Sequence, residues 1–274
     1  MGIASVNGIE LAYEVHGDPE GVPLLLICGL GQQLVGWHPD LLKAMTRRGY
    51  RVMVFDNRDV GLSTHFDHFG HPDLPAILAG RDPAPYRLED LAADAVGLLD
   101  ALGLDSAHVF GVSMGGMVAQ LVAVGYPDRV RSLISVMSHP GDRRVRPAPE
   151  ADALLVRPAA TTLEEFVEAA EESARIIGSP EFMPDLQWLR RRAQLTWERR
   201  YNSAGVARQL AAILTAADRT EALGRLSIPA LVVHGSADPL VPVLGGRLTA
   251  AAIPAAELLE IDGMGHDPPR QVWD

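Results

Sequence analysis

The chain has 274 residues, 47% of them hydrophobic, and a formal net charge of -11 at pH 7. This length suits one α/β domain with an insertion or two small domains, and this composition is typical of a globular protein with a large core. The acidic balance argues against a nucleic-acid-binding surface and against a polybasic membrane patch.

Targeting signals and cysteines also limit the interpretation. No apolar run approaches membrane-spanning length, and the first residues do not combine a charged start with an apolar run, so neither membrane insertion nor a signal peptide is expected. Cys28 is the only cysteine, which excludes an internal disulfide. A reducing, cytoplasmic location is the expectation.

The first predicted elements alternate strands with glycine-rich turns. Residues 8–16 alternate weakly and predict an edge strand, whereas the continuous apolar run 22–27 is typical of a strand buried on both faces of a parallel sheet. Gly29-Leu30-Gly31 follows this core strand and lets backbone approach a ligand closely. It is no phosphate loop, because no Gly-Lys-Ser/Thr follows. A helix over about 39–48 and a second buried strand over 51–55 come next.

A polar turn and an irregular segment follow the second core strand. In the turn, Asp56 and Arg58 can pair and bond loop backbone, so a buttressing role is expected. The segment from 65 to 85 holds histidines and aspartates that invite a metal-site interpretation. They lack helical or paired-ligand spacing, so a solvated loop is favoured and no metal is predicted. These residues are His65, Asp67, His68, His71 and Asp73.

The next stretch decides the interpretation. After an amphipathic helix over 88–102, the apolar strand 107–112 runs into Gly111-x-Ser113-x-Gly115, and a helical pattern begins directly afterwards. A serine on a tight strand-to-helix turn has a strained backbone and needs small neighbours for the turn to close. Its hydroxyl lies near a helix N-terminus, where N–H groups favour developing negative charge. The motif alone also fits a capping serine, but this context favours a nucleophile elbow.

Helical patterns dominate the following region. A further strand is predicted over 130–137, but from 142 to about 226 no strand-like run occurs. Thr162 and Glu165 form a capping-box pattern for one helix. Two more helices are predicted over 184–200 and 206–215. A helical insertion between sheet strands is therefore expected, and its place in the chain suggests a lid.

Sheet signals return near the end of the chain. Strands are predicted over 229–233 and 256–261, with a helix over 245–252 between them. The alternation of strands and helices predicts a mostly parallel central sheet flanked by helices, which is an α/β fold. The expected domains are an α/β core of residues 1–140 and 227–274 and a helical cap of residues 141–226.

Three reactive residues follow predicted strands, where reactive groups gather in such sheets. Ser113 needs a base to take its proton, His266 suits that task, and Asp238 can hold the other ring N–H. Alone, Asp238 also fits a turn-initiating residue and His266 a surface histidine. Their order with Ser113 is the one expected for a hydrolase triad. Other candidates rank lower because they start turns, namely His139, His234 and Asp262.

Over residues 9–267 the chain resembles the α/β-hydrolases, and among them the serine esterases related to bacterial aclacinomycin methylesterase. Three segments carry the resemblance, namely FDNRDVGLS at 55–63, GVSMG at 111–115 and GMGH at 263–266. The resemblance implies Ser113 as nucleophile, His266 as base and Asp238 as the acid that orients it. It also implies an oxyanion hole made by the backbone N–H groups of Leu30 and Met114.

The chain departs from these relatives in two places. Cys28-Gly29 stands where many relatives have His-Gly, which concerns the support of the loop because the oxyanion donor is a main-chain N–H. Relatives also continue into a final helix that packs on the sheet, whereas this sequence stops at Trp273-Asp274. Residues 268–274 can form the first turn of that helix, and two explanations stay open, namely a trimmed sequence and a sheet edge that is covered in another way.

The sequence thus predicts a serine hydrolase that cleaves carboxylic esters of a small or medium-sized apolar substrate. A small-molecule ester is the expected partner, no cofactor is needed, and the oligomeric state stays open. Four aromatic residues are expected to line an apolar pocket, and those in the insertion also fit a core of the lid itself. They are Trp37, Phe166, Trp188 and Trp197.

The same triad serves other reactions. Lactone and thioester hydrolysis, carbon–carbon bond hydrolysis and perhydrolysis begin at a similar site, and a low-turnover small-molecule receptor would keep it as well. An epoxide hydrolase or haloalkane dehalogenase is disfavoured, because an aspartate would stand where this chain has Ser113.

Overall fold

The computed structural model describes residues 1–273, in which eight strands form one sheet. The strand order is β1-β2-β4-β3-β5-β6-β7-β8. The pairs β1–β2 and β2–β4 are antiparallel and all other pairs are parallel, so the predicted mostly parallel α/β fold is confirmed. The strands are β1 (Gly2–Val6), β2 (Ile9–His16), β3 (Val22–Ile27), β4 (Tyr50–Phe55), β5 (Ala107–Val112), β6 (Val130–Val136), β7 (Ala230–Gly235) and β8 (Ala256–Ile261).

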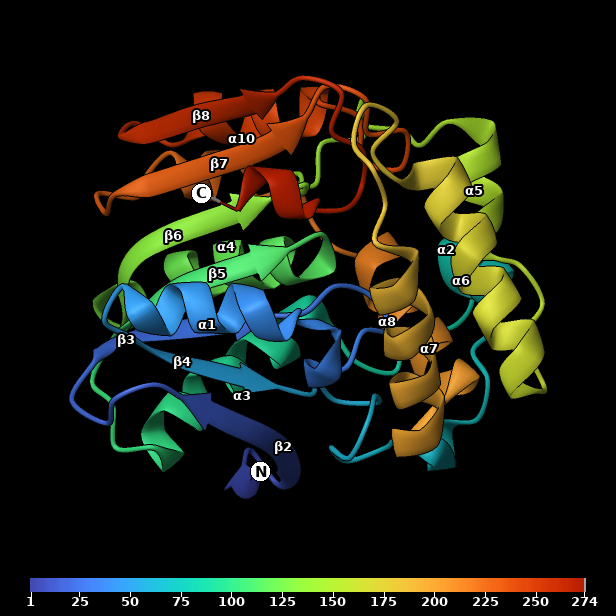
Figure 1. Cartoon of the computed structure of the whole chain (residues 1–274), viewed down its shortest axis with the longest axis horizontal. Helices are drawn as coiled ribbons and strands as arrows, with labels where there is room; N and C mark the ends of the chain where they lie inside the picture. The colour runs from blue at the N-terminus through green and yellow to red at the C-terminus, as the bar shows by residue number, and fades with distance from the viewer. Residues whose placement is uncertain (274) are drawn as a thin grey trace.

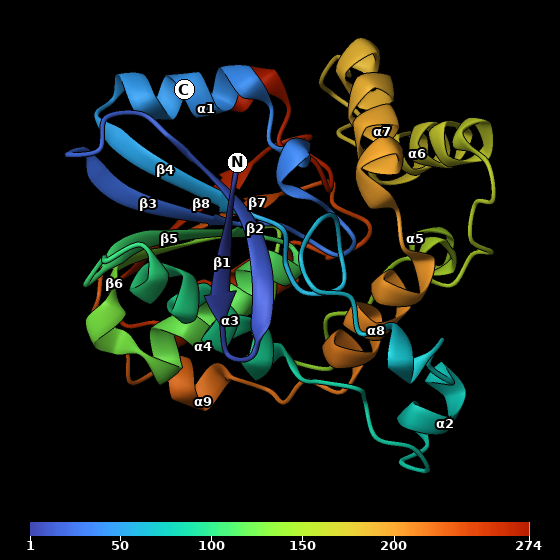
Figure 2. The ribbon, with the colours of Figure 1, turned by 90° about the horizontal axis from the view of Figure 1, so that it is seen from below.

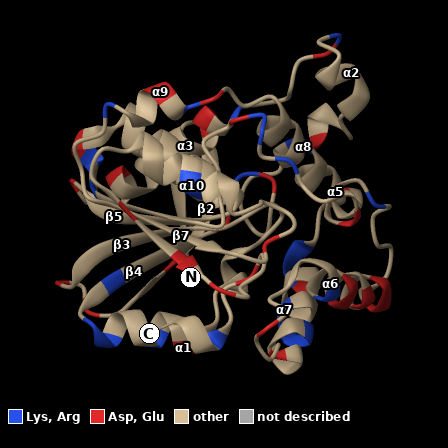
Figure 3. Ribbon diagram, turned by 90° about the horizontal axis from the view of Figure 1, so that it is seen from above, with Lys and Arg blue, Asp and Glu red and all other residues tan. Residues whose placement is uncertain are grey.

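Helices cover both faces of the sheet. Helix α1 (Pro39–Arg47) lies on one face, and α3 (Leu88–Ala101) and α4 (Met114–Gly125) lie on the other (Figure 2). Helix α10 (Leu244–Ala252) shares the face of α3, as the view from above shows (Figure 3). The other helices are α2 (Leu74–Leu78), α5 (Pro149–Leu155), α6 (Leu163–Ile177), α7 (Leu186–Arg200), α8 (Ser203–Leu214) and α9 (Thr220–Leu223).

The first strand corrects one prediction. Strand β2 forms where a strand was predicted, but it is not the edge, because β1 pairs with its outer side. The two strands are joined by Asn7 at φ 48° and Gly8 at φ 78°. An Asn-Gly pair with both φ values positive is the preferred two-residue hairpin turn. Weak alternation alone does not reveal such a hairpin, and the Asn-Gly dipeptide is the signal that does.

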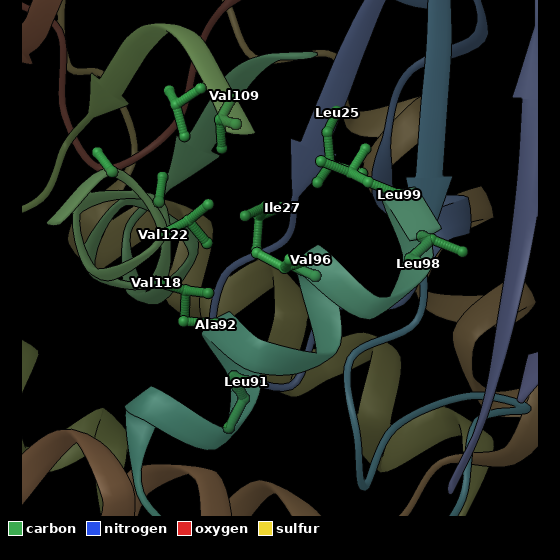
Figure 4. Close-up of a cluster of buried hydrophobic side chains, with 14 of the residues drawn as sticks. Leu25, Ile27, Leu91, Ala92, Val96, Leu98, Leu99, Val109, Val118 and Val122 are labelled. Atoms are coloured by element: carbon green, nitrogen blue, oxygen red, sulfur yellow. The ribbon is translucent and has the colours of Figure 1, made fainter. Parts of the chain in front are cut away.

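The largest apolar core lies between the sheet and helices α3 and α4 (Figure 4). Leu25 and Ile27 of β3 are fully buried on this face, while Leu26 is fully buried on the opposite one. Strand β3 is therefore buried on both sides, as its unbroken apolar run predicts. Each such side chain stabilises the fold by about 1.5–3 kcal/mol relative to exposure. The strand that precedes the Gly29-Leu30-Gly31 loop is thus anchored in the core on both faces.

In the described residues, the chain between β6 and β7 contains no strand and holds the helices α5 to α9 with loops between them. Helices α5 to α8 lie beyond the carboxyl ends of the parallel strands (Figure 1). The predicted helices over 184–200 and 206–215 are confirmed as α7 and α8, whereas α5 and α9 had no clear periodic signal. We call residues 141–226 the helical insertion.

Two details of helix termini differ from the predictions. Thr162 caps α6 by accepting the Glu165 N–H at 3.2 Å, but the Glu165 carboxylate accepts the N–H of Thr161 at 2.7 Å, so the reciprocal bond of the capping box is displaced by one residue. Near the end of the chain, Arg270–Val272 form a 3-10 turn. Asp274 lies outside the described residues.

None of the described helices has both the length and the apolar character needed to cross a bilayer.

Candidate active site

Ser113 occupies the turn between β5 and α4. Its backbone has φ 54° and ψ -120°, a conformation that costs a non-glycine residue free energy. A Cβ on Gly111 would lie 2.0 Å from the Gly115 oxygen, and one on Gly115 would lie 2.1 Å from the Ile27 oxygen. The tight strand-to-helix turn expected from the Gly-x-Ser-x-Gly spacing is therefore present, and the two glycines are required by close approach of backbone.

Three residues from separate loops lie in a hydrogen-bonded line. His266 Nε2 is 2.9 Å from Ser113 Oγ, and His266 Nδ1 is 2.7 Å from Asp238 Oδ2. The Asp238 side chain is fully buried, and its Oδ1 accepts the N–H groups of Leu240 and Val241 at 2.9 Å each. The carboxylate is held by these amides, so it orients the imidazole with a proton on Nδ1 and leaves Nε2 to face the serine hydroxyl.

The lower-ranked candidates have other contacts. His234 is fully buried and donates from Nε2 to the Val241 oxygen at 2.7 Å, and burial lowers the pKa of this histidine. Burial also lowers the pKa of His139 to about 4, and its Nδ1 accepts the Gly141 N–H at 3.1 Å. Asp262 accepts the Ser236 hydroxyl at 2.7 Å. These side chains support turns, and among the described residues His266 is the histidine bonded to Ser113.

Two backbone amides flank the serine. Met114 is the first residue of α4, so no intrahelical carbonyl can accept its N–H. Leu30 follows Gly29, and a Cβ on Gly29 would lie 3.4 Å from the Ser113 Cβ. The N–H groups of Leu30 and Met114 are thus carried by the two segments that adjoin the serine side chain.

A glutamine of the helical insertion anchors the loop after β3. Gln209 of α8 is fully buried, and its Oε1 accepts the Gly31 N–H at 2.9 Å while its Nε2 donates to the Arg58 oxygen at 2.8 Å. The sequence analysis did not identify this residue. A polar side chain on the apolar face of a predicted amphipathic helix is the signal that can find it, because buried amides need partners.

The predicted pairing of Asp56 with Arg58 is wrong. Asp56 is fully buried and pairs with Arg199 of α7 at 2.9 Å, while Arg58 pairs with Asp94 of α3 at 2.7 Å. The two side chains face different neighbours, because Asp56 also accepts the Leu34 N–H at 2.7 Å. Burial raises the pKa of Asp56, although Arg199 opposes that shift. The turn does buttress the loop after β3, but it uses a partner from the insertion.

The aromatic residues proposed as pocket lining make these contacts. Trp37 is buried and meets Phe110 edge-on at 5.8 Å between ring centroids. Phe166 and Trp197 lie 5.7 Å apart within the insertion, and Trp188 lies 4.6 Å from the His38 ring. The Phe166–Trp197 contact agrees with a core of the insertion itself, and the lining of a substrate pocket by these four residues stays a prediction.

The His- and Asp-rich segment makes several separate contacts. His65 Nδ1 is 2.7 Å from Asn202 Nδ2, Asp67 accepts from Arg208 at 3.3 Å, and Asp73 caps α2 through the Ala76 N–H. Within residues 1–273 no three His, Cys, Asp or Glu side chains are grouped as metal ligands would be.

A family model described as alpha/beta hydrolase fold matches residues 22–269. The chain belongs to the α/β-hydrolase family. It is 28% identical to the rhodomycin D methylesterase DauP of Streptomyces sp. (strain C5), over 97% of this chain and 92% of that protein. It is 31% identical to a putative carbamate hydrolase RutD of Caulobacter segnis, over 97% and 92%.

Among solved structures, a thermophilic esterase from Thermogutta terrifontis has a TM-score of 0.71 and 26% identity, covering 97% of this chain and 90% of that one. The resemblance to serine esterases is therefore confirmed at the level of the family. The protein is a hydrolase of the esterase type.

Proposed function

We propose that this α/β-hydrolase cleaves carboxylic esters of small or medium-sized apolar substrates through Ser113, His266 and Asp238. The observation that carries the proposal is the unbroken line from the Ser113 hydroxyl to the buried Asp238 carboxylate, with bonds of 2.9 Å and 2.7 Å through one imidazole. The elbow conformation of the serine and the esterase relatives support it.

Acylation begins when Ser113 Oγ attacks the ester carbonyl carbon and His266 Nε2 takes the hydroxyl proton. The imidazolium that forms is stabilised by the Asp238 carboxylate, whose position is fixed by two backbone N–H groups. The tetrahedral intermediate then expels the alcohol, which receives the proton from His266. An ester of Ser113 with the acyl group remains.

Deacylation repeats the chemistry with water. His266 takes a proton from water, the hydroxide adds to the acyl carbon, and the Ser113 oxygen leaves with the proton returned by His266. In both halves the negative charge on the carbonyl oxygen is stabilised by the N–H groups of Leu30 and Met114. Loss of one such donor costs about 3 kcal/mol in activation free energy. The chemistry needs no cofactor.

The helical insertion acts in this proposal as a lid on a core of residues 1–140 and 227–274. Helices α5 to α8 of the insertion lie at the carboxyl ends of the strands, where the reactive loops are (Figure 1). Contacts from α7 and α8 reach the loop after β3 through Arg199 and Gln209. A lid in this position shields the reacting ester from bulk solvent and bounds the substrate pocket, while leaving access for the water that hydrolyses the acyl-enzyme.

Carbamate hydrolysis is a second candidate, because one relative is a putative carbamate hydrolase with 31% identity over 97% of this chain. The carbamate carbonyl is attacked by the same serine, but nitrogen donation makes it less electrophilic. A p-nitrophenyl carbamate assayed beside the esters separates the two, and faster turnover of the carbamate would favour this candidate.

The test is turnover of p-nitrophenyl acetate to octanoate by the wild type and by Ser113→Ala, combined with fluorophosphonate labelling. We expect hydrolysis and a label on Ser113 in the wild type, and loss of both in the variant. The expected loss in kcat is at least about 10⁴-fold. A wild type that is labelled at Ser113 but hydrolyses none of these esters would point to a receptor or a carbon–carbon bond hydrolase. Absence of labelling would refute the role of Ser113.

A further inference from the structure

The loop that carries His266 is bonded to the end of helix α6 in the insertion. The His266 N–H donates to the Ile177 oxygen at 2.6 Å. The Gly265 N–H donates to Ser179 Oγ at 2.9 Å, and the Ser179 hydroxyl donates to Asp267 Oδ1 at 2.5 Å. Three consecutive residues around the histidine are therefore bonded to Ile177, the last residue of α6, and to Ser179, two positions further along the chain.

The two segments also approach each other closely. A Cβ on Gly265 would lie 2.3 Å from the Gly178 oxygen, and a Cβ on Gly263 would lie 2.5 Å from the Glu181 side chain. The Ile177 carbonyl belongs to the last turn of α6, where carbonyls lack intrahelical partners, so the His266 amide satisfies it. The contact is a built interface in which both glycines are required.

The hydroxyl of Ser179 has no role in ending α6. The helix ends with the Gly178 N–H bonded to the Ala174 oxygen, and the Ser179 hydroxyl is used on residues 265 and 267 instead. Asp238 fixes the direction of the imidazole through Nδ1, but it does not hold the main chain of the histidine. In the described residues the main-chain hydrogen bonds of Gly265, His266 and Asp267 all go to residues 177–179.

We propose that Ser179 is a positioning residue for the catalytic histidine. It holds Gly265 and Asp267 on either side of His266, so that Nε2 stays within reach of Ser113 Oγ. The inference rests on the proposed function, because it assigns Ser179 to the same proton transfer. It also makes the insertion part of the catalytic scaffold, since the triad is complete only while residues 177–179 are docked on the loop.

The experiment compares Ser179→Ala and Ser179→Thr with Ser173→Ala as the matched control. Ser173 also belongs to the α6 region, but its hydroxyl bonds only the Ala169 oxygen of its own helix at 2.8 Å. With p-nitrophenyl butyrate, we expect S179A to lower kcat by about 10- to 100-fold, because small misplacements of reacting groups cost this much. KM should stay within about threefold, since Ser179 has no part in substrate binding. Threonine keeps the hydroxyl and should restore most of kcat, and S173A should match the wild type.

A second readout is independent of turnover. The proton on His266 Nδ1, bonded to Asp238, gives a low-field resonance in the proton NMR spectrum, and we expect it to broaden in S179A but not in S179T. If the wild type hydrolyses no ester while this resonance still depends on Ser179, the esterase proposal fails and the positioning role stands. An S179A variant with wild-type kcat and an unchanged resonance would overturn the inference. If S179A does not fold, Ser179→Cys keeps the side-chain size and weakens the bonds to both Gly265 and Asp267, and wild-type kcat with an unchanged resonance in that variant would overturn the inference.

Discussion

The insertion holds the two sides of Ser113 by different kinds of interaction. On the side of Leu30, the buried Asp56 carboxylate pairs with Arg199, whose side chain is 15% exposed. On the side of His266, the bonds join main-chain groups, one serine hydroxyl and the half-buried Asp267 carboxylate, and among the described residues no cation is hydrogen-bonded there. The first attachment buries the Asp56 carboxylate, so its stability depends on the opposite charge of Arg199. The second depends on the close packing of two backbone segments that keeps their hydrogen bonds short. One side should therefore respond to charge and pH, and the other to geometry.

The largest loss of activity is expected from a change at the hydrogen bond between His266 Nδ1 and Asp238. Asp238→Asn would present an amide N–H to His266 Nδ1, which favours the tautomer with a proton on Nε2, and that nitrogen cannot then accept the Ser113 proton. We expect kcat for p-nitrophenyl butyrate to fall about 10⁴-fold with little change in thermal stability. Steady-state kinetics with a thermal melt measures both.

Asp262→Asn is the matched control, since Asp262 also follows a parallel strand of the sheet but bonds Ser236. It should keep wild-type kcat. If D262N were as inactive as D238N, the assignment of the orienting carboxylate would be wrong.

On the other side, Arg199→Met should act mainly on stability. It leaves Asp56 buried without a cation, which costs about 3–5 kcal/mol of unfolding free energy. Burial already raises the pKa of Asp56 above its unfolded value, and loss of Arg199 raises this pKa further. The native state then binds more protons than the unfolded state, so the stability of R199M should fall as pH rises through the folded-state pKa and recover on acidification.

Urea unfolding between pH 5 and pH 8 measures this dependence, because a raised carboxyl pKa moves the titration above the ordinary value of about 4. Arg191→Met is the control, because Arg191 is exposed and bonds only Gln194 at 3.3 Å. A deficit in R199M that did not change with pH would show that Asp56 is not the group left unpaired.

The sequence predicted the parts of the site that depend on local patterns. Ser113, Asp238 and His266 each follow a strand-like run, and the strand-end rule places such residues at one edge of a parallel sheet. Only glycine fits at positions 111 and 115, because a Cβ there would collide with backbone, and the Gly-x-Ser-x-Gly motif shows this requirement in the sequence. Strand pattern and turn chemistry are short-range properties, so a single sequence expresses them.

The attachments of the insertion could not be predicted in the same way. Asp56 and Arg199 are separated by 143 positions, and Gly31 and Gln209 by 178. Their pairing depends on how helices pack over the sheet edge, and Arg58 offered Asp56 a nearer partner in the sequence. Ser179 gave no signal for a related reason, because a serine after a helix is ordinary in composition and gains its role only from the loop that docks on it.

The smallest effect argued for the Leu30 side is that of Gln209→Ala. The substitution leaves the Gly31 N–H and the Arg58 oxygen without their partner. Gly31 is only half-buried, so water can replace the bond there, and the expected cost is about 1–3 kcal/mol of unfolding free energy for the buried Arg58 oxygen. Because Gly31 adjoins Leu30, whose N–H is the proposed oxyanion donor, a shift of this loop should also lower kcat, by about tenfold. Gln194→Ala is the control, since that glutamine bonds only exposed side chains on α7. A Q209A variant that lost stability but kept full kcat would show that the loop after β3 keeps its shape without the bond to the insertion. The His266 loop would then be the side of Ser113 on which activity depends on the insertion.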